Sequence, residues 1–406
     1  MKDLNLLYED MRGRLALELS GLRHVSDDAL YEMIEREIAE AERQECLSVR
    51  EKLSLRASLF NAFRRLDILQ ELVDTKDITE IMVNGKDHIF VEKGGRVVRW
   101  NRSFKSNEQL EDMIQQIVSR VNRVVNVSTP IADARLEDGS RVHVVLPPVS
   151  LGGPVVTIRK FPEPITMEKL IGYGSVTPEA AAFLKKLVKA GYNIFISGGT
   201  NSGKTTFLNA LSSFIPDEER VITIEDSAEL QLNHIRNLVR LETRSANTEG
   251  EGAVTISDLI RASLRMNPDR IVVGEVRGGE ALDMLQAMNT GHDGSLSTGH
   301  ANSPRDMLSR LETMVLCGAD LPLAAIRSQI SGALDILIHL GRLRDHSRHV
   351  LSITEVGDYS NGEIQLNELY VFREKTGGRR GRVEGSLVRT GELKNTAKLS
   401  AAGIEL

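Results

Sequence analysis

The stretch GGTNSGKTT, from Gly198 to Thr206, matches the phosphate-binding loop pattern G-x-x-x-x-G-K-[ST]. In such a loop the glycines let backbone N–H groups curl around phosphate oxygens, while Lys204 reaches the β- and γ-phosphates and the Thr205 hydroxyl ligates Mg²⁺. The alternative is a glycine-rich turn that holds no ligand. We expect a nucleotide site whose contacts come from Gly198, Gly199, Thr200, Asn201, Ser202, Gly203, Lys204, Thr205 and Thr206.

The sequence around this loop predicts a strand before it and a helix after it. Residues 193–196 are a short apolar run typical of a buried strand, and residues 206–211 favour a helix. Such a helix would add the positive end of its dipole to an anion site. Further along, strand-like runs at 221–224, 238–241 and 271–273 alternate with helical stretches, which predicts a parallel sheet and an α/β fold.

Composition limits the class of protein. The chain has 406 residues, of which 41% are hydrophobic and 27% charged, as in a soluble globular protein of two or three domains. A net charge of -6 and an aromatic content of 4% disfavour nucleic acid as a partner. The two cysteines, Cys46 and Cys317, form no C-x-x-C pair, so neither a disulfide framework nor a zinc knuckle is expected, and a reducing cytosol fits best. The sequence predicts neither a secretion signal nor a membrane span.

Changes in composition divide the chain into five segments. We expect a helical extension over 1–72, an α/β domain over 73–161, a linker over 162–177, the nucleotide-binding domain over 178–370 and a basic, glycine-rich tail over 371–406. The extension either packs as a small bundle on its neighbours or serves as a docking element. The tail is expected to be solvated, with binding of an anion or of a partner as the alternative.

The first α/β domain has short β-type runs separated by glycine-containing turns. One helix is predicted from 107 to 125. Strands are predicted at 78–83, 88–91, 97–100, 141–146 and 155–159.

Charged side chains follow three of the strands predicted in the second domain. Glu225 and Asp226 follow the run at 221–224, Glu275 follows 271–273, and His300 follows 295–299. Ligands of an open parallel sheet collect at the carboxyl ends of its strands. Hydrolysis needs one group to hold Mg²⁺ and another to orient the attacking water, and Glu225 and Glu275 can divide these tasks. The alternatives are carboxylates that end strands in solvent and a histidine that serves only a turn.

Four sequence blocks carry a resemblance to a known family. They are GGTNSGKTT, TIEDSAEL, LRMNPDRIVVGEVRGGEA and TGHDGSLSTGHANSP, in that order. The chain resembles a secretion-superfamily ATPase of the type II/type IV secretion and pilus class, whose blocks are named Walker A, Asp box, Walker B and His box. Within it, the stretch from Ala132 to Phe161 is similar to the tight-adherence (Flp) pilus assembly ATPases of the CpaF type. The resemblance extends from about residue 70 to 370.

The resemblance implies a RecA-like motor domain behind an N-terminal α/β domain of PAS-like appearance. It matches Glu275 to the Walker B glutamate and Glu225 to the Asp-box glutamate, leaving open which of them activates water, and His300 to a γ-phosphate sensor. Mg²⁺ would be held by Thr205, Glu225 and Glu275. Family arginines that reach the bound nucleotide correspond to Arg135 and Arg159, with Arg141 as a weaker third.

The resemblance also implies ATP and Mg²⁺ as cofactors and assembly as a homohexamer. The expected partner is an inner-membrane platform protein of a pilus or secretion system, so the protein would be cytoplasmic and peripheral at the inner face of the cytoplasmic membrane. Two departures stand out: two cysteines cannot build the four-cysteine zinc module of many type II export ATPases, and the segment before residue 72 is outside the shared core. A RecA-type nucleic-acid translocase and a nucleotide-gated scaffold with little hydrolysis remain the alternative functions. Pilus extension, pilus retraction and secretion also remain open.

Overall fold

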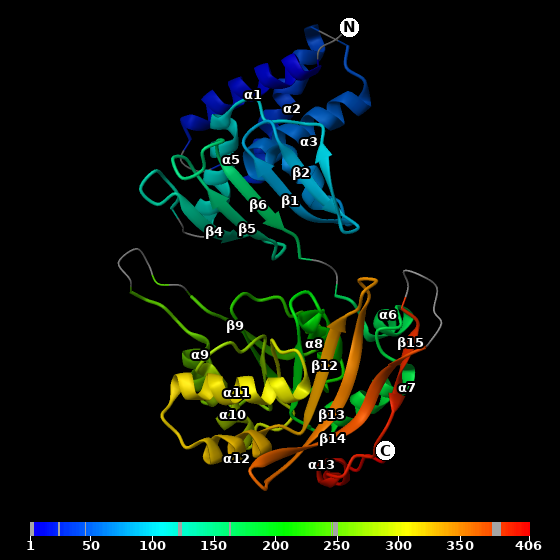
Figure 1. Cartoon of the computed structure of the whole chain (residues 1–406). Coiled ribbons are helices and arrows are strands. Elements are labelled where there is room, and N and C mark those ends of the chain that lie inside the picture. The colour runs from blue at the N-terminus through cyan, green and yellow to red at the C-terminus, as the bar shows by residue number, and fades with distance from the viewer. Residues whose placement is uncertain are drawn as a thin grey trace. The chain divides into compact units, whose positions relative to one another are not determined.

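The computed structural model divides the chain into two compact units, Met1–Glu163 and Pro164–Leu406, each with its own sheet and core (Figure 1). The structure describes residues 4–22, 25–44, 46–120, 124–161, 164–244, 246, 251–375 and 383–406.

Three helices open the first unit. They are α1 (Leu4–Ser20), α2 (Asp27–Gln44) and α3 (Val49–Arg64), and a short helical turn, η1 (Asp67–Leu69), leads into α4 (Gln70–Asp74). Apolar side chains at helical spacing, including Leu30 and Ile34, are fully buried where the three helices meet. Ion pairs link the helices on the outside, for example Arg14 to Glu37 at 2.7 Å. Exposed pairs of this kind contribute little each, so burial holds the bundle together.

The sheet of the first unit is antiparallel, with strand order β3-β2-β1-β6-β5-β4. Alternate residues of its strands are buried together with helix α5 (Asn107–Arg120), so α5 covers one face and the other face is left open. The helix ends at Arg120, short of the predicted residue 125; residues 121–123 lie outside the described part of the chain. Strand β4 was not predicted. The strands are β1 (Ile78–Asn84), β2 (Ile89–Lys93), β3 (Arg96–Trp100), β4 (Ile131–Arg135), β5 (Arg141–Val145) and β6 (Val155–Arg159).

The second unit is built on a nine-stranded sheet of order β15-β14-β13-β12-β7-β11-β10-β8-β9. The six strands from β12 to β9 are parallel, and the three from β13 to β15 are added in antiparallel pairing. Every residue of β7, β10 and β11 is buried, as expected for strands covered on both faces. The strands are β7 (Ile194–Gly198), β8 (Arg220–Glu225), β9 (Asn237–Glu242), β10 (Arg270–Val273), β11 (Leu296–Gly299), β12 (Ile336–Arg342), β13 (Arg348–Ser360), β14 (Glu363–Glu374) and β15 (Gly385–Arg389).

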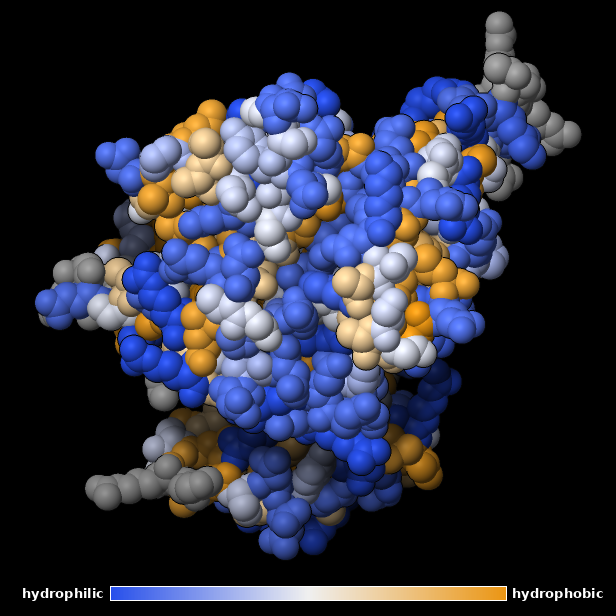
Figure 2. Space-filling view, turned by 90° about the horizontal axis from the view of Figure 1, so that it is seen from below, coloured by the Kyte–Doolittle hydropathy of each residue, from blue (hydrophilic) through white to orange (hydrophobic). Residues whose placement is uncertain are grey.

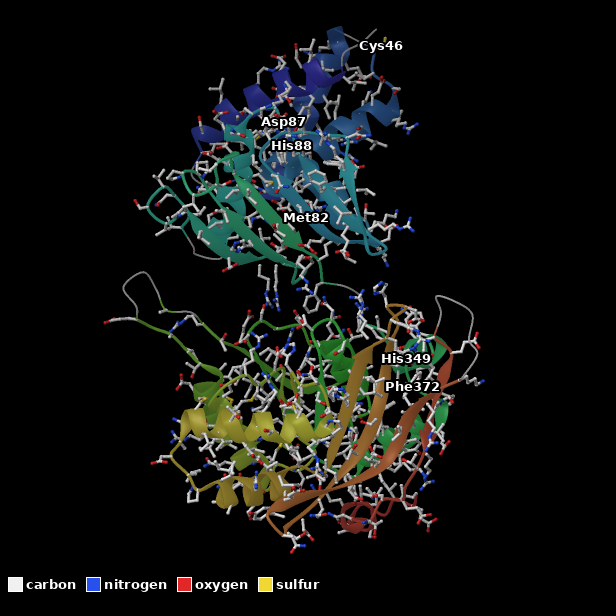
Figure 3. All side chains as sticks on the ribbon, viewed as in Figure 1. Cys46, Met82, Asp87, His88, His349 and Phe372 are labelled. Carbon is white, nitrogen blue, oxygen red and sulfur yellow. The ribbon has the colours of Figure 1, made fainter. Side chains whose placement is uncertain are left out.

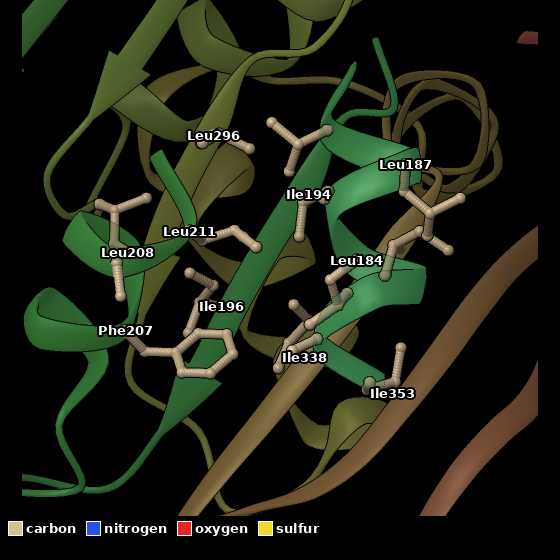
Figure 4. Close-up of a cluster of buried hydrophobic side chains, with 14 of the residues drawn as sticks. Leu184, Leu187, Ile194, Ile196, Phe207, Leu208, Leu211, Leu296, Ile338 and Ile353 are labelled. Carbon is tan, nitrogen blue, oxygen red and sulfur yellow. The ribbon is translucent and has the colours of Figure 1, made fainter. Parts of the chain in front are cut away.

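Helices cover both faces of this sheet. On one face lie α6 (Met167–Gly172), α7 (Pro178–Lys189) and α8 (Lys204–Ser212). Figure 4 shows this packing, in which Phe207 and Leu211 of α8 lie beside Ile194 and Ile196 of β7. The other face is covered by α9 (Ile256–Ser263), α10 (Glu280–Asn289), α11 (Pro304–Gly318) and α12 (Leu323–Ala333).

The structure corrects the predicted linker over 162–177. Residues 162 and 163 lie outside the described part of the chain, but helix α6 forms in the middle of this stretch, capped by the Thr166 side chain. Met167 and Leu170 are buried in the core of the second unit. The cap and the apolar pair three residues apart therefore outweigh the glycines that follow, and the second unit begins at Pro164.

The structure also corrects the predicted solvated tail over 371–406. Strand β14 continues to Glu374, β15 pairs with it, and α13 (Ala397–Ala401) follows. Leu387, Leu393 and Leu399 are buried in the core. The buried Glu355 carboxylate accepts a hydrogen bond from the backbone N–H of Asn395 at 2.7 Å. The run of glycines and arginines at 377–382 lies outside the described residues.

Apolar side chains are mostly turned inward. The face shown in Figure 2 is largely hydrophilic, with hydrophobic residues in small separate groups. Among the described residues, no helix has the length and apolar character needed to cross a membrane.

The docking of the C-terminal segment can be tested with Leu399→Ala, with Ser400→Ala as an exposed control on the same helix. Removing a buried leucine side chain costs about 2–5 kcal/mol. Urea unfolding should show that loss for Leu399→Ala and little change for the control. Equal stabilities for the two variants would instead support the original prediction of a solvated tail.

Candidate functional site

The phosphate-loop stretch forms a tight turn between β7 and α8. Gly203, at φ +93°, caps the helix in the left-handed region, and Asn201 also has a positive φ of 60°. A Cβ on Gly198 would lie 2.5 Å from the Leu340 carbonyl oxygen, so only glycine fits there. The predicted order of strand, loop and helix is confirmed, with the first amides of α8 at the loop.

Lys204 lies within the loop, with only 8% of its surface exposed. Its Nζ donates to the Gly199 carbonyl oxygen at 3.1 Å and contacts Nδ1 of His300 at 3.3 Å. Burial lowers the pKa of Lys204, while the charge of Glu275 opposes that shift. A buried cation that directly contacts only neutral groups favours binding of an anion.

His300 joins Lys204 to Glu275. Its Nε2 lies 2.8 Å from Oε1 of Glu275, on the side of the ring away from Lys204. Since the ammonium can only donate, Nδ1 accepts, which in a neutral ring leaves the hydrogen on Nε2. The contact of Nε2 with Oε1 of Glu275 is close, but Oε1 is buried and takes no hydrogen bond among the described residues. Burial first, and then the Lys204 charge, lower the pKa of His300, which agrees with the neutral form.

Glu275 is also held from its other side. Its Oε2 accepts hydrogen bonds from Nε of Arg277 at 3.0 Å and from Nη2 at 2.6 Å. The third nitrogen, Nη1, lies 3.6 Å from Oδ2 of Asp226. A continuous chain of polar contacts thus runs from Lys204 through His300 and Glu275 to Asp226. It joins the loop to the ends of β8, β10 and β11, which is the edge where an open parallel sheet collects its ligands.

Glu225 has a different environment from Glu275. It is only 3% exposed, and its Oε2 accepts the backbone N–H groups of Glu229 at 2.7 Å and Leu230 at 3.0 Å. Burial raises its pKa. Its Oε1 is buried and has no hydrogen-bond partner among the described residues. Glu225 therefore anchors the segment after β8 and offers one remaining oxygen.

The donor set suits Mg²⁺ bound mainly by phosphate. Within the described ranges, no group of three or more His, Cys, Asp or Glu side chains is arranged to hold a metal ion by itself. Mg²⁺ at nucleotide sites keeps several waters and takes one or two protein ligands besides phosphate oxygens. The Thr205 hydroxyl, the Glu275 carboxylate and the unpartnered Oε1 of Glu225 are oxygen ligands of that kind.

The three arginines predicted to reach the nucleotide lie side by side in the first unit. Arg135 on β4 is directly opposite Arg141 on β5, which is directly opposite Arg159 on β6. Opposite residues share a face, and this is the open face of the sheet, where Arg159 is exposed and the other two are half-buried. Arg159 is in turn directly opposite Glu80 on β1, and the three guanidinium groups offer forked, charged donors of the kind that bind an anion.

Sequence reasoning missed two residues beside the loop. Arg277 could have been noticed two positions after Glu275, but no local signal pointed to Arg348, at the start of β13. Its Nε donates to the carbonyl oxygen of Asn201 at 2.9 Å. Arg348 also lines a cavity of about 270 Å³ with Tyr173, Ser202, Gly203, Thr206 and His349. His349 is backed by Phe372, with ring centroids 5.0 Å apart (Figure 3).

Comparison with known sequences places most of the chain in one family. A family model described as type II/IV secretion system protein matches residues 64–384. The chain is 36% identical over 305 residues to a putative conjugal transfer protein of Mycobacterium tuberculosis, covering 73% of this chain and 86% of that protein. It is 33% identical over 303 residues to the type IV secretion system protein PtlH of Bordetella pertussis, covering 68% and 89%.

Solved structures confirm the predicted fold class. The pilus retraction motor PilT with bound ADP is similar with a TM-score of 0.54 and 20% identity, covering 83% of this chain and 85% of that one. The ATPase DotB of Legionella pneumophila is similar with a TM-score of 0.52 and 20% identity, covering 72% and 80%. At these identities the likeness shows the fold alone, a RecA-like α/β motor fold.

The different environments of Glu225 and Glu275 predict different effects on stability. Glu225→Ala removes the acceptor of two backbone N–H groups, of which the buried one, of Leu230, would be left unsatisfied at a cost of about 1–3 kcal/mol. At roughly 2–4 °C per kcal/mol for a domain of this size, the melting temperature should fall by several degrees. Glu275→Ala removes contacts to side chains only and should shift it less. Equal shifts in a thermal melt would contradict the anchoring role of Glu225.

Proposed function

The chain belongs to the type II/IV secretion system protein family, and we propose that it is a Mg²⁺-dependent ATPase that converts ATP hydrolysis into mechanical work. The observation that carries this proposal is the chain of contacts from Lys204 through His300 to Glu275 at the phosphate loop. A loop that only bound nucleotide would need Lys204 but not a histidine and a carboxylate aligned behind it.

The loop residues take the binding role. Amides of the turn and the first turn of α8 would hold the β- and γ-phosphates, and Lys204 would turn its ammonium to them. Thr205 and Glu275, with Glu225 in support, would hold Mg²⁺, which when bound neutralises charge on the phosphates. His300, already in contact with Lys204, is placed to sense whether a γ-phosphate has drawn that ammonium away.

Glu275 is the better candidate for activating water. Its side chain is 19% exposed and lies in the chain that begins at Lys204, whereas Glu225 is buried and bonded to backbone. A carboxylate that accepts a hydrogen bond from water orients it for attack on the γ-phosphate. We therefore assign water activation to Glu275 and a supporting role to Glu225.

The cavity beside the loop is proposed to take the base. It adjoins Gly203 and Thr206, and its walls include Ile165, Leu170, Phe207 and Tyr173. Flat apolar and aromatic walls with a few polar groups are what a purine requires. Arg348, bound to the Asn201 carbonyl oxygen, would keep the loop and the cavity in a fixed relation.

The arginines of the first unit are proposed to complete the site in the assembled motor. Arg135 and Arg159, with Arg141 between them, carry fixed charges and forked donors that stabilise a phosphoryl-transfer transition state. Nucleotide would draw the two units together through them, and hydrolysis would release them. We propose that the motor is a homohexamer.

The cellular role is proposed to be assembly of a tight-adherence (Flp) pilus, with an inner-membrane platform protein as partner at the inner face of the cytoplasmic membrane. The stretch from Ala132 to Phe161 supports this choice through its similarity to that branch. The curated relatives named above are conjugal transfer and type IV secretion proteins, so secretion stays the alternative.

Two variants test the ATPase proposal. Lys204→Ala should abolish both nucleotide binding and turnover, because the buried ammonium is the loop's main charge for phosphate. Glu275→Gln should keep nucleotide binding and lose hydrolysis by about 100-fold or more. Phosphate release and binding of a fluorescent ATP analogue measure the two effects. Very slow turnover of the unaltered protein would favour the scaffold alternative, and stimulation by DNA would favour the translocase.

The arginine row is tested by Arg135→Gln and Arg159→Gln. Each should lower kcat by about 100-fold at saturating ATP, as removal of transition-state donors does elsewhere. Arg99→Gln is the matched control, since Arg99 lies on the same open face at the opposite edge strand, β3. Equal kcat values for the row variants and the control would contradict the proposed role of Arg135 and Arg159.

A further inference from the structure

Glu275 faces a conflict between its position and its proposed task. Oε2 accepts two hydrogen bonds from Arg277, so neither of its lone pairs is left for water. Oε1 lies 2.8 Å from Nε2 of His300; it makes no hydrogen bond among the described residues, but it is buried away from solvent. A general base must present a free lone pair to the proton that it takes. Activation of water at the more accessible Oε2 would therefore require Arg277 to leave Glu275.

A second acceptor for Arg277 lies close by. Nη1 of Arg277 is 3.6 Å from Oδ2 of Asp226, just beyond hydrogen-bond distance. Asp226 follows β8 and Arg277 follows the neighbouring strand β10. The two carboxylates therefore lie on either side of one guanidinium group.

The backbone and side chain of Arg277 differ in freedom. Its backbone N–H donates to Oε1 of Glu280 at 2.6 Å, and the next amide, of Gly278, donates to the same oxygen at 2.9 Å. The Arg277 side chain is 64% exposed, against 19% for Glu275. The Glu280 side chain at the start of α10 therefore holds the backbone of Arg277 in place, while most of its side chain is exposed to solvent.

We propose that Arg277 is a positioning residue that holds Glu275 in the resting site and passes to Asp226 when nucleotide and Mg²⁺ are bound. This proposal rests on the proposed ATPase function and describes how that activity is regulated. In the resting state the arginine competes for the oxygen that Mg²⁺ or water needs. Passing to Asp226 frees that oxygen and keeps the arginine charge paired, so Glu275 becomes available only when its ligands have arrived.

The test compares Arg277→Gln, Asp226→Asn and the double variant in the full chain. Arg261→Gln is the matched control, because Arg261 is an exposed arginine of the same unit, paired with Asp283 at 3.0 Å and outside the site. The first measurement is the Mg²⁺ concentration that half-saturates the fluorescence of bound mant-ADP. Arg277→Gln should lower it by about threefold, the scale of losing one exposed ion pair, and the control should not change it.

The second measurement is kcat in a double-mutant cycle. Asp226→Asn should lower kcat by about threefold with KM unchanged, because the arginine then has no other carboxylate to move to. In the Arg277→Gln background the same substitution should have no effect, because there is no arginine left to transfer. An arginine that only braced the fold would instead lower the melting temperature and give independent effects.

The proposal is overturned if Arg277→Gln leaves the Mg²⁺ dependence unchanged, or if Asp226→Asn lowers kcat equally with and without Arg277. Either result would leave the ATPase proposal intact as long as Lys204→Ala and Glu275→Gln remain inactive. Hydrolysis by those two variants would instead remove the function on which Arg277 acts.

Discussion

The parallel pairing of β8, β10, β11 and β7 is the constraint on which the rest of the site depends. Val273 lies opposite Ile224, and Gly299 lies opposite Ser197, so the strands end at one edge. A slip of one residue would turn the following side chain to the other face of the sheet. Burial on both faces prevents it, since every residue of β10 is buried. Packing of apolar residues therefore sets the positions of the charged groups.

Charge is arranged at this edge so that the site is stable without ligand and ready for an anion. Lys204 is almost buried, and a lone buried cation would cost several kcal/mol. The neutral ring of His300 lies between Lys204 and Glu275, so the negative charge of Glu275 is near enough to stabilise the ammonium. Arg277 in turn pairs with Glu275. Alternating charges along one chain keep each group near a partner. Phosphate that binds Lys204 would weaken the contact between Lys204 and His300. That change would alter the surroundings of Glu275 although the phosphate does not contact Glu275.

Local patterns predicted the loop, its strand and its helix, and the strand ends that bring Glu275 and His300 near Lys204, because each depends on a few consecutive residues. They failed where the outcome depends on distant pairing. The antiparallel strands after β12 exist because β12 pairs with β7, more than a hundred residues earlier. Arg348 meets the loop through the same pairing. Sequence also could not separate Glu225 from Glu275, since their burial and their hydrogen-bond partners distinguish them, and both depend on the folded structure.

In the proposed motor, the arginine row would make the arrangement of the two units depend on the nucleotide. Arg135 lies opposite Arg141, and Arg141 lies opposite Arg159, so three forked cationic donors share one face. A triphosphate would offer these donors more charge than a diphosphate, so hydrolysis would weaken the attraction. A ligand can move two bodies only by as much as its affinity differs between their arrangements. Attraction of the arginine row to the γ-phosphate, together with the proposed release of Glu275 by Arg277, would make that difference depend on the γ-phosphate.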